Sequence, residues 1–315
     1  MANAGICRVM IIGAGRVGSH CAMSLIPGHL ADEIVLIDRN RPLAEAQAAD
    51  LYDFATGMGS TVAVRAGSYE DCDDASFVLI AAGRGRRATE TRLELLHDTL
   101  EALRDIASRL SHTRFCGVVV CITNPVDVVT EYLRQQLDLP AGHVLGTGSA
   151  LDTIRLRRML AQRTGVDVAQ IQGFCMGEHG DSSFVAWSHV SLGGVPLAEY
   201  ALMHDELWER LDFGEIQDEI HGTGASIIAG KGCTEFGIGS VVTDIVRAVS
   251  RNQTRVLPLS AHLEGEYGQG DISIGVPCAI GAGGVQRVLE VELTEHEAKL
   301  FAHSCDVIRH ALEAK

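Results

Sequence analysis

Three segments of this chain carry side chains that can bind an anion, transfer a proton and stabilise negative charge. Asp152 and Arg155 are three residues apart in a helical pattern, so both can project from one face of a helix. His179 stands in a glycine-flanked, loop-like stretch, where an exposed imidazole can exchange a proton near neutral pH. Arg92 follows the polar, arginine-rich stretch 83–91, whose composition is typical of a loop that closes over a site.

These side chains together meet the needs of one reaction, hydride transfer to a 2-oxo acid. That reaction needs an anchor for the carboxylate, a proton donor to the carbonyl oxygen, and a positive group that polarises the carbonyl. Arg155 suits the anchor because the planar fork of an arginine binds both carboxylate oxygens. Taken singly, a pair such as Asp152 and Arg155 is more often an ion pair on a helix surface, and His179 is one of 13 histidines. The prediction depends on the whole set.

A glycine-rich turn near the start of the chain predicts a dinucleotide site. The turn follows the apolar strand pattern 9–12 and leads into a helix. Glycines there allow a tight turn and a close approach of the backbone to pyrophosphate, which faces the helix N-terminus. The candidate residues are Gly13, Ala14, Gly15, Arg16, Val17 and Gly18.

Asp38 refines this prediction to NAD. It closes the next apolar strand, 20 residues after Gly18, where a carboxylate accepts hydrogen bonds from ribose hydroxyls and repels a 2′-phosphate. The alternative is a glycine-rich turn with a solvated aspartate. Arg39 and Arg41 leave open whether the preference for NAD over NADP is strict.

Alternating strand and helix patterns must position these residues in the first half of the chain. Continuous apolar runs of strand length indicate strands buried on both faces, as in a parallel sheet; they occur at 9–12, 34–37, 77–81 and 117–122. Between them, leucines and alanines at three- and four-residue steps predict a helix over 92–110. This repetition indicates right-handed crossovers and a doubly wound sheet.

The pattern changes near residues 148–150. Beyond it we expect a strand pair within 170–190, helices over 215–229 and 237–251, and a final helix that starts at Thr294, which has capping-box spacing to Glu297. The expected fold class is therefore α/β, with a Rossmann-type doubly wound parallel sheet followed by a mixed α+β substrate domain. The expected domains are an NAD-binding domain over 1–149 and a substrate-binding, catalytic domain over 150–315.

Composition excludes several classes of function. The 315 residues are 46% hydrophobic and 21% charged, without an apolar run near the roughly 20 residues that cross a bilayer. The start lacks the pattern of a secretory signal. Nine scattered cysteines without zinc spacing indicate free thiols in a reducing cytoplasm and no metal site. A net charge of −15 argues against nucleic acid as a partner. We expect a cytoplasmic protein with no membrane role.

The sequence resembles the L-lactate/malate dehydrogenase family along essentially its whole length. Several segments match in the family order, which makes chance similarity a poor explanation; they are GAGRVG from 13, AAGRGRRATETRLELL from 81, NPVD from 124, LDTIRLR from 151, GEHGDSSFVAWS from 177, KGCTEFGIG from 231 and IGVP from 274.

The resemblance implies a role for each candidate residue. His179 would donate the proton in reduction and accept it in oxidation, with Asp152 holding its imidazole. Arg155 would bind the substrate carboxylate, and Arg92 would polarise the carbonyl. Asn124 would hydrogen-bond near the substrate and nicotinamide. The resemblance also implies that Thr234 and Gly224 line the substrate side-chain pocket, and that Ala82 and Gly83 join the cofactor site.

The resemblance also points to the residue that reads the substrate side chain. This residue lies six positions before the carbonyl-polarising arginine and is here Arg86. Lactate-specific members resemble one another in having glutamine there, and malate-specific members have arginine. Arg86 could pair with the second carboxylate of oxaloacetate, whereas over the methyl group of pyruvate its charge would be uncompensated. Arg86 therefore slightly favours oxaloacetate and malate.

Other positions favour lactate or a bulkier 2-hydroxy acid. Glu90 could neutralise Arg86, and Gly224, where lactate enzymes carry alanine, should widen the pocket. The segments 184–188 and 231–234 resemble lactate and hydroxyisocaproate dehydrogenases. Ala88-Thr89 replaces the usual Pro-Gly of the loop, and a shift of one residue would bring a neighbouring arginine into the pocket. Pyruvate/lactate and hydroxyisocaproate-type substrates stay open as alternatives.

The resemblance implies a homodimer or homotetramer and raises the question of allosteric control. Many bacterial lactate dehydrogenases bind fructose 1,6-bisphosphate with an arginine and a histidine at a subunit interface. Arg157 matches the arginine, but Gln172 stands at the position of the histidine, so we expect no strong activation.

Two other classes of protein are disfavoured. A non-enzymatic dinucleotide-binding module has no need for the catalytic set, and an NAD-dependent glycosidase needs metal ligands and a longer chain.

Overall fold

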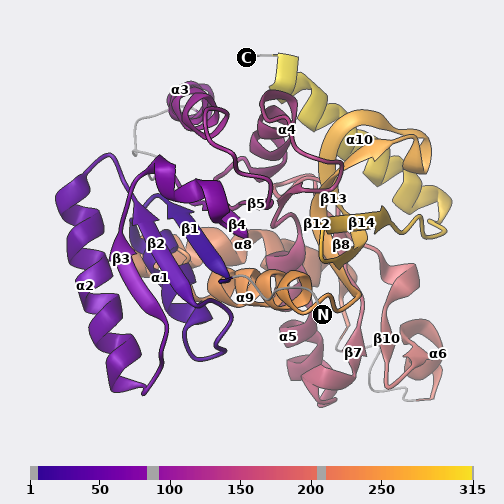
Figure 1. The fold of residues 1–315 in the computed structure, drawn as a ribbon. Coiled ribbons are helices and arrows are strands. Elements are labelled where there is room, and N and C mark those ends of the chain that lie inside the picture. The colour runs from indigo at the N-terminus through magenta and orange to yellow at the C-terminus, as the bar shows by residue number, and fades with distance from the viewer. Residues whose placement is uncertain (1–5, 84–91, 204–210, 314–315) are drawn as a thin grey trace.

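A computed structural model describes residues 6–83, 92–203 and 211–313, and the side chains of all of these except 92–97. Its main sheet has nine strands in the order β14-β13-β12-β6-β5-β4-β1-β2-β3 (Figure 1). The parallel part consists of β1 (Arg8–Ile12), β2 (Glu33–Ile37), β3 (Ala63–Ala66), β4 (Phe77–Ile80), β5 (Val118–Cys121) and β6 (Val144–Gly146). The order reverses between β1 and β4, which is where doubly wound sheets bind ligands. The predicted doubly wound parallel sheet is confirmed.

Helices connect these strands and cover their apolar side chains. They are α1 (Arg16–Leu25), α2 (Arg41–Gly57), α3 (Arg92–Leu110), α4 (Val126–Gln136) and α5 (Ala150–Thr164). The predicted helix over 92–110 is α3. Strands β4 and β5 are buried at every position, as continuous apolar runs require when both faces of a sheet are covered. Helix α2 begins after Asn40, whose side chain accepts a hydrogen bond from the backbone N–H of Leu43.

Three antiparallel strands extend the same sheet into the second half of the chain. They are β12 (Arg255–Glu264), β13 (Gly270–Gly281) and β14 (Gly284–Val288). Ser260 on β12 pairs with Gly146 on β6, so the parallel and antiparallel parts share one sheet. The sequence patterns did not identify these strands.

The elements that follow α5 include a group of short strands and two helices, part of which lies beside α5 (Figure 1). The short strands are β7 (Ile171–Gln172), β8 (Cys175–Met176), β9 (Phe184–Val185), β10 (Ser191–Leu192) and β11 (Val195–Pro196), and the helices are α6 (Leu197–Leu202) and α8 (Phe213–Lys231). The predicted strand pair within 170–190 is two short pairs, β7 with β10 and β8 with β9. Short 3₁₀ helices lie at Tyr69–Asp74, Val168–Gln170, Trp187–His189 and Glu266–Gly268.

Helices α9 (Phe236–Ser250) and α10 (Glu295–Glu313) complete the fold. Helix α9 packs against α1, and α10 packs against α4 and β13. The predicted capping box at the start of α10 is present: the Thr294 hydroxyl accepts from the Glu297 backbone N–H, and the Glu297 carboxylate accepts from the Thr294 backbone N–H.

Two separate groups of buried side chains hold the molecule together. The larger surrounds the main sheet. The smaller lies between α5, α8 and the short strands, and includes Leu156, Leu160, Ile216 and Ile220, each fully buried. Helix α5 therefore joins the two cores: its first residues, Ala150 and Leu151, belong to the larger core, and Leu156, Met159 and Leu160 belong to the smaller one. Among the described residues, none of the helices is both long and apolar enough to cross a membrane.

Candidate active site

The glycine-rich turn lies at the reversal point of the sheet, between β1 and α1. Gly13 has a φ of +102°, and a β-carbon there would lie 2.6 Å from the carbonyl carbon of Ala81. A β-carbon at Gly18 would lie 1.9 Å from the carbonyl oxygen of Gly13. Gly15, in contrast, borders open space. Gly13 and Gly18 are therefore required by packing, and Gly15 leaves room beside the turn for a ligand.

The start of α1 offers hydrogen-bond donors to that space. Gly15 is the N-cap and has no side chain that could accept from the first backbone N–H groups of the helix. Uncapped N–H groups and the helix dipole favour an anion at this end. The residues present thus fit the pyrophosphate of a dinucleotide.

Asp38 is held beside the same turn at the end of β2. Its Oδ2 accepts a hydrogen bond of 2.9 Å from the backbone N–H of Ala14, and its Oδ1 accepts one of 2.8 Å from the N–H of Asn40. Arg41, which left the cofactor preference open, pairs with Glu45 along α2. The carboxylate of Asp38 is therefore oriented by the turn that would hold the pyrophosphate.

Replacing Asp38 with asparagine is expected to raise the use of NADPH relative to NADH. The amide oxygen can still accept from Ala14, but the charge that repels a 2′-phosphate is lost. We expect the ratio of kcat/KM for NADPH to kcat/KM for NADH to rise about tenfold or more, a difference of at least ~1.4 kcal/mol. Asp32→Asn is the control, because Asp32 lies at the start of β2 and accepts from the N–H of Cys7. Equal ratios in both variants would contradict the role of Asp38.

The ends of β4 and β5 form the other side of this crevice. The Thr123 hydroxyl donates to the carbonyl oxygens of Ile80 and Ala82, at 3.2 and 2.7 Å. A β-carbon at Gly83 would lie 3.3 Å from the Thr123 side chain. Asn124 follows directly and is exposed. The predicted cofactor-site residues Ala82, Gly83 and Asn124 therefore lie together beyond the carboxyl ends of β4 and β5, next to Gly13.

The structure brings together His179, Asp152 and Arg155. The ring nitrogen Nδ1 of His179 lies 2.7 Å from Asp152 Oδ2, and Arg155 Nη1 donates to Asp152 Oδ1 at 2.9 Å. The side chains of Asp152 and Arg155 are 7% and 10% exposed, whereas that of His179 is 22% exposed. An ionised carboxylate can only accept, so Nδ1 of His179 carries the hydrogen and Nε2 is the nitrogen that can exchange a proton.

The electrostatics of this cluster favour a protonated imidazole. Burial by itself would lower the pKa of His179, but the Asp152 carboxylate, assisted by Asp127, raises that pKa above its ordinary value. Burial would raise the pKa of Asp152, but His179 and then Arg155 hold it below its usual range. A histidine that binds its proton firmly suits a donor to a carbonyl oxygen as negative charge develops there.

Close main-chain contacts fix the loop that carries His179. Gly177, with a φ of +94°, exchanges backbone hydrogen bonds with Gly275 on β13. A β-carbon at Gly275 would lie 2.6 Å from the Gly177 carbonyl oxygen, so the strand must have glycine there. The hydroxyl of Ser304 on α10 accepts from the backbone N–H of Glu178 at 2.7 Å. The loop is thus attached to both β13 and α10.

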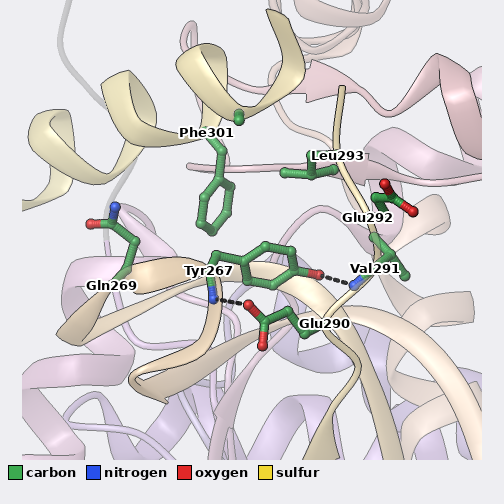
Figure 2. Close-up of a pocket in the computed structure, with 8 residues that line it drawn as sticks. Tyr267, Gln269, Glu290, Val291, Glu292, Leu293 and Phe301 are labelled. Atoms are coloured by element: carbon green, nitrogen blue, oxygen red, sulfur yellow. Dashed lines mark hydrogen bonds between the residues drawn. The ribbon is translucent and has the colours of Figure 1, made fainter. Parts of the chain in front are cut away.

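A cavity of about 380 Å³ is lined in part by Ala298 and Phe301 of α10 (Figure 2). Phe301 of α10 packs on the ring of Tyr267 with centroids 4.9 Å apart. The Tyr267 hydroxyl donates to the carbonyl of Leu289 and accepts from the backbone N–H of Val291. None of the predicted site residues lines this cavity. Its aromatic wall is one turn of α10 from Ser304, so it supports the helix that holds the His179 loop.

Helix α8 closes the site beside Arg155. A β-carbon at Gly224 would lie 3.5 Å from Arg155 Nη2, which places this predicted pocket residue next to the predicted carboxylate anchor. His221, one turn earlier, bonds the hydroxyl of Ser183 at 2.9 Å and helps to lower the pKa of Asp152. The lack of a side chain at Gly224 leaves space beside Arg155.

Thr234 lies between α8 and α9, in a segment fastened to the cofactor turn. The neighbouring Glu235 is 3% exposed and accepts two hydrogen bonds from Arg16, at 3.1 and 3.2 Å. Arg16 also donates to the carbonyl of Lys231. The predicted cofactor residue Arg16 and the predicted pocket residue Thr234 are thus connected through Glu235.

Some predicted residues lie outside the described part of the chain. These are Arg86 with its neighbours in the loop 84–91, and the side chain of Arg92. Arg157 is described: it is partly buried and its Nη2 donates to the carbonyl of Gly173, next to the exposed Gln172. Burial and the nearby Arg255 lower the pKa of Arg157.

Several residues in and around the site carried only weak signals in the sequence and were not predicted. Asp127 was part of a matched segment, NPVD, but had no chemistry of its own to suggest a role. Its Oδ2 accepts from the backbone N–H of His179 at 2.8 Å. His221 and Ser304 belong to ordinary helix patterns, and Glu235 lies in the matched segment that starts at 231; only their contacts distinguish them.

Comparison with known proteins agrees with this geometry. The family model described as "lactate/malate dehydrogenase, NAD binding domain" matches residues 7–146, and "lactate/malate dehydrogenase, alpha/beta C-terminal domain" matches residues 149–315. L-lactate dehydrogenase 1 of Bifidobacterium longum subsp. longum is 39% identical over 306 residues, which is 97% of each chain.

Solved structures show the same similarity across the whole chain. A minor L-lactate dehydrogenase from Enterococcus mundtii, in its ligand-bound form, is 37% identical with a TM-score of 0.93 and covers 98% of each chain. A malate dehydrogenase from Cryptosporidium parvum is 26% identical with a TM-score of 0.90, again over 98% of each chain. Both halves of the predicted enzyme, the dinucleotide crevice and the histidine cluster, are thus parts of a single known scaffold, and the chain belongs to the lactate/malate dehydrogenase family of NAD-dependent 2-hydroxy acid oxidoreductases.

Proposed function

We propose that this enzyme interconverts a small 2-oxo acid and its L-2-hydroxy acid, with His179 as the proton donor in reduction and the acceptor in oxidation. NADH, when bound, supplies the hydride. The observation that carries the proposal is the chain of contacts from Arg155 through Asp152 to His179, with Nε2 of the imidazole free to exchange a proton.

Each residue of the cluster has a distinct task in this proposal. The guanidinium of Arg155 binds the substrate carboxylate with two parallel hydrogen bonds. Asp152 orients the ring of His179 and stabilises the imidazolium. The proton leaves Nε2 for the carbonyl oxygen as hydride reaches the carbon. Arg92 polarises that carbonyl, and Asn124 hydrogen-bonds near the substrate and nicotinamide.

We propose oxaloacetate and malate as the preferred pair because of Arg86. A second carboxylate on the substrate would compensate the charge of Arg86, whereas the methyl group of pyruvate would leave a cation without a partner in a closed site. An enzyme discriminates between substrates in this way when the wrong substrate leaves a buried polar or charged group of the site without a partner.

Pyruvate and lactate are the second candidate. The relatives of highest similarity described above carry the name L-lactate dehydrogenase. Glu90 could neutralise Arg86 within the loop. The absence of a side chain at Gly224, next to Arg155, would also favour a bulkier 2-oxo acid such as 2-oxoisocaproate.

NADH oxidation with oxaloacetate, pyruvate and 2-oxoisocaproate in parallel separates these candidates. We expect the highest kcat/KM with oxaloacetate in the wild type. Arg86→Gln should shift preference toward pyruvate by at least about tenfold, because it removes the partner of the second carboxylate. Arg84→Gln and Arg87→Gln are the matched controls for the register of the loop. A wild type that prefers pyruvate, or a shift that occurs only in a control, would sink the argument from Arg86.

We also propose a division into an NAD-binding domain, 1–149, and a substrate-binding domain, 150–315. The two family-model matches, which meet between residues 146 and 149, and the separate core beside α5 support it.

We propose a homodimer or homotetramer; exposed apolar side chains on α2 and near α9, among them Tyr52, Met58 and Phe236, support association. Gln172 supports the absence of strong activation by fructose 1,6-bisphosphate.

A further inference from the structure

Two carboxylates, not one, hold His179. Asp152 bonds the ring nitrogen Nδ1, and Asp127 bonds the main chain, accepting from the His179 backbone N–H at 2.8 Å. Asp127 is the second residue of α4 and is 2% exposed. It comes three residues after Asn124. It therefore connects the carboxyl end of β5, where the cofactor site is expected, to the loop that carries His179.

The second oxygen of Asp127 makes this carboxyl unusual. Oδ1 is buried and has no hydrogen-bond partner among the described residues, and the same holds for the hydroxyl of Ser260 on β12. Ser260 nevertheless lies near enough to Asp127 to lower its pKa. An asparagine at this position could accept from the His179 N–H and donate to the Ser260 hydroxyl, leaving no polar group unpaired. A carboxylate is the costlier choice unless its charge has a use.

We propose that Asp127 is a positioning residue with two tasks: its oxygen anchors the backbone of His179, and its negative charge stabilises the imidazolium. The proposal rests on the proposed role of His179 and extends it. Asp127 acts through His179 and has no contact with the substrate in this assignment.

The charged groups around the pair set the pH range of the effect. His179 and Glu178 act on Asp127, and Asp152, Asp127 and Arg155 act on His179. Burial raises the pKa of Asp127 to about 6, against the lowering effect of the His179 N–H and imidazole. Asp127 is therefore neutral in acid and supports the imidazolium only above about pH 6. Its removal should matter little below that pH and progressively more above it.

The pH profile of kcat/KM for 2-oxo acid reduction tests this inference with three variants. Asp127→Asn keeps the anchor and removes the charge. We expect it to match the wild type within a few fold below pH 6 and to lose activity earlier on the alkaline side, by about one pH unit. Asp127→Ala removes both, so its activity should fall at every pH by roughly 10- to 100-fold. Ser260→Ala should shift the alkaline loss of activity in the same direction as Asp127→Asn does, but by less.

Glu131→Gln is the matched control. Glu131 lies one turn further along α4, is fully buried, and binds His262, Arg134 and Ser273 instead of the His179 loop. Glu131→Gln should lower the melting temperature without moving the pH profile of kcat/KM. Asp127→Asn, in contrast, should keep or raise the melting temperature at pH 8, because ionisation of a carboxyl whose pKa is raised by folding disfavours the folded state above that pKa.

The outcomes separate this inference from the proposed function. If His179→Asn abolishes turnover but the profiles of Asp127→Asn and Ser260→Ala superimpose on that of the wild type, the charge of Asp127 has no role. If Asp127→Asn does not fold, Ser260→Ala decides alone, and an unshifted profile overturns the inference. Normal turnover in His179→Asn would instead overturn the proposed function.

Discussion

Turnover is expected to fall by about 10²- to 10⁴-fold when His179 is replaced by asparagine. The amide can still donate a hydrogen bond toward Asp152 from near the position of Nδ1, so the pocket should keep its shape. It cannot exchange a proton at neutral pH, so the carbonyl oxygen has no donor as charge develops. NADH binding, measured by fluorescence titration, should be unchanged within about twofold because the glycine turn is not altered.

His189→Asn is the control for this change. His189 lies further along the same part of the chain and bonds the backbone carbonyl of Glu292, away from Asp152. Near-normal turnover in His179→Asn, or an equal loss in His189→Asn, would refute the assignment of the proton donor.

The raised pKa of His179 predicts opposite pH dependences for the two directions. Reduction requires the imidazolium, so its rate should fall as the pH rises through the pKa of His179. Oxidation requires the neutral ring, so its rate should fall as the pH drops through the same pKa. Because Asp152 raises this pKa, the fall in the reduction rate and the fall in the oxidation rate should both be centred above the ordinary histidine pKa of about 6.5. His179→Asn should lack them.

Arg155→Lys is expected to lower kcat/KM by roughly 10²- to 10³-fold, although the positive charge is retained. Arg155 donates to Asp152 with one nitrogen and has others for the substrate carboxylate. A lysine cannot serve both partners in one plane, so either the substrate or Asp152 loses a charge-assisted hydrogen bond in a buried site. Such losses cost about 2–5 kcal/mol.

Steady-state kinetics should show a higher KM for the 2-oxo acid together with a lower kcat. Arg158→Lys on the same helix is the control, because Arg158 is exposed. Kinetics of Arg155→Lys equal to those of Arg158→Lys would exclude Arg155 as the carboxylate anchor.

The local parts of the site could be predicted because their chemistry is written in neighbouring residues. Glycines at fixed spacing after an apolar strand, and an aspartate closing the next strand, describe a turn whose geometry depends on residues close in the chain. The pair Asp152 and Arg155 also follows from helix periodicity, and both side chains do lie on one face. The boundaries of α3 and α9 agree with the patterns because their apolar spacing is strong.

Other features could not be predicted because their partners are distant in sequence. Strands β12 and β13 have neither the uninterrupted apolar runs of β4 and β5 nor a short hairpin signal at their turn, and they form because they pair with each other and with β6. Glu131 and Glu235 are buried carboxylates, which sequence patterns place on the surface. They are tolerated inside because arginine and other donors from distant segments satisfy them.

The sequence by itself determined the fold class and the cofactor, and it singled out the three residues to which we assign the chemistry, because each depends on local spacing or on motifs in a recognisable order. Only the tertiary structure decided that His179 is held by Asp127 as well as Asp152, that Ser304 and Gly275 fix its loop, and that Glu235 joins the cofactor turn to the substrate segment. The physical reason is that a hydrogen bond to a backbone N–H, and the burial of a charge, leave no periodic mark in the chain. They exist only once distant segments have packed together.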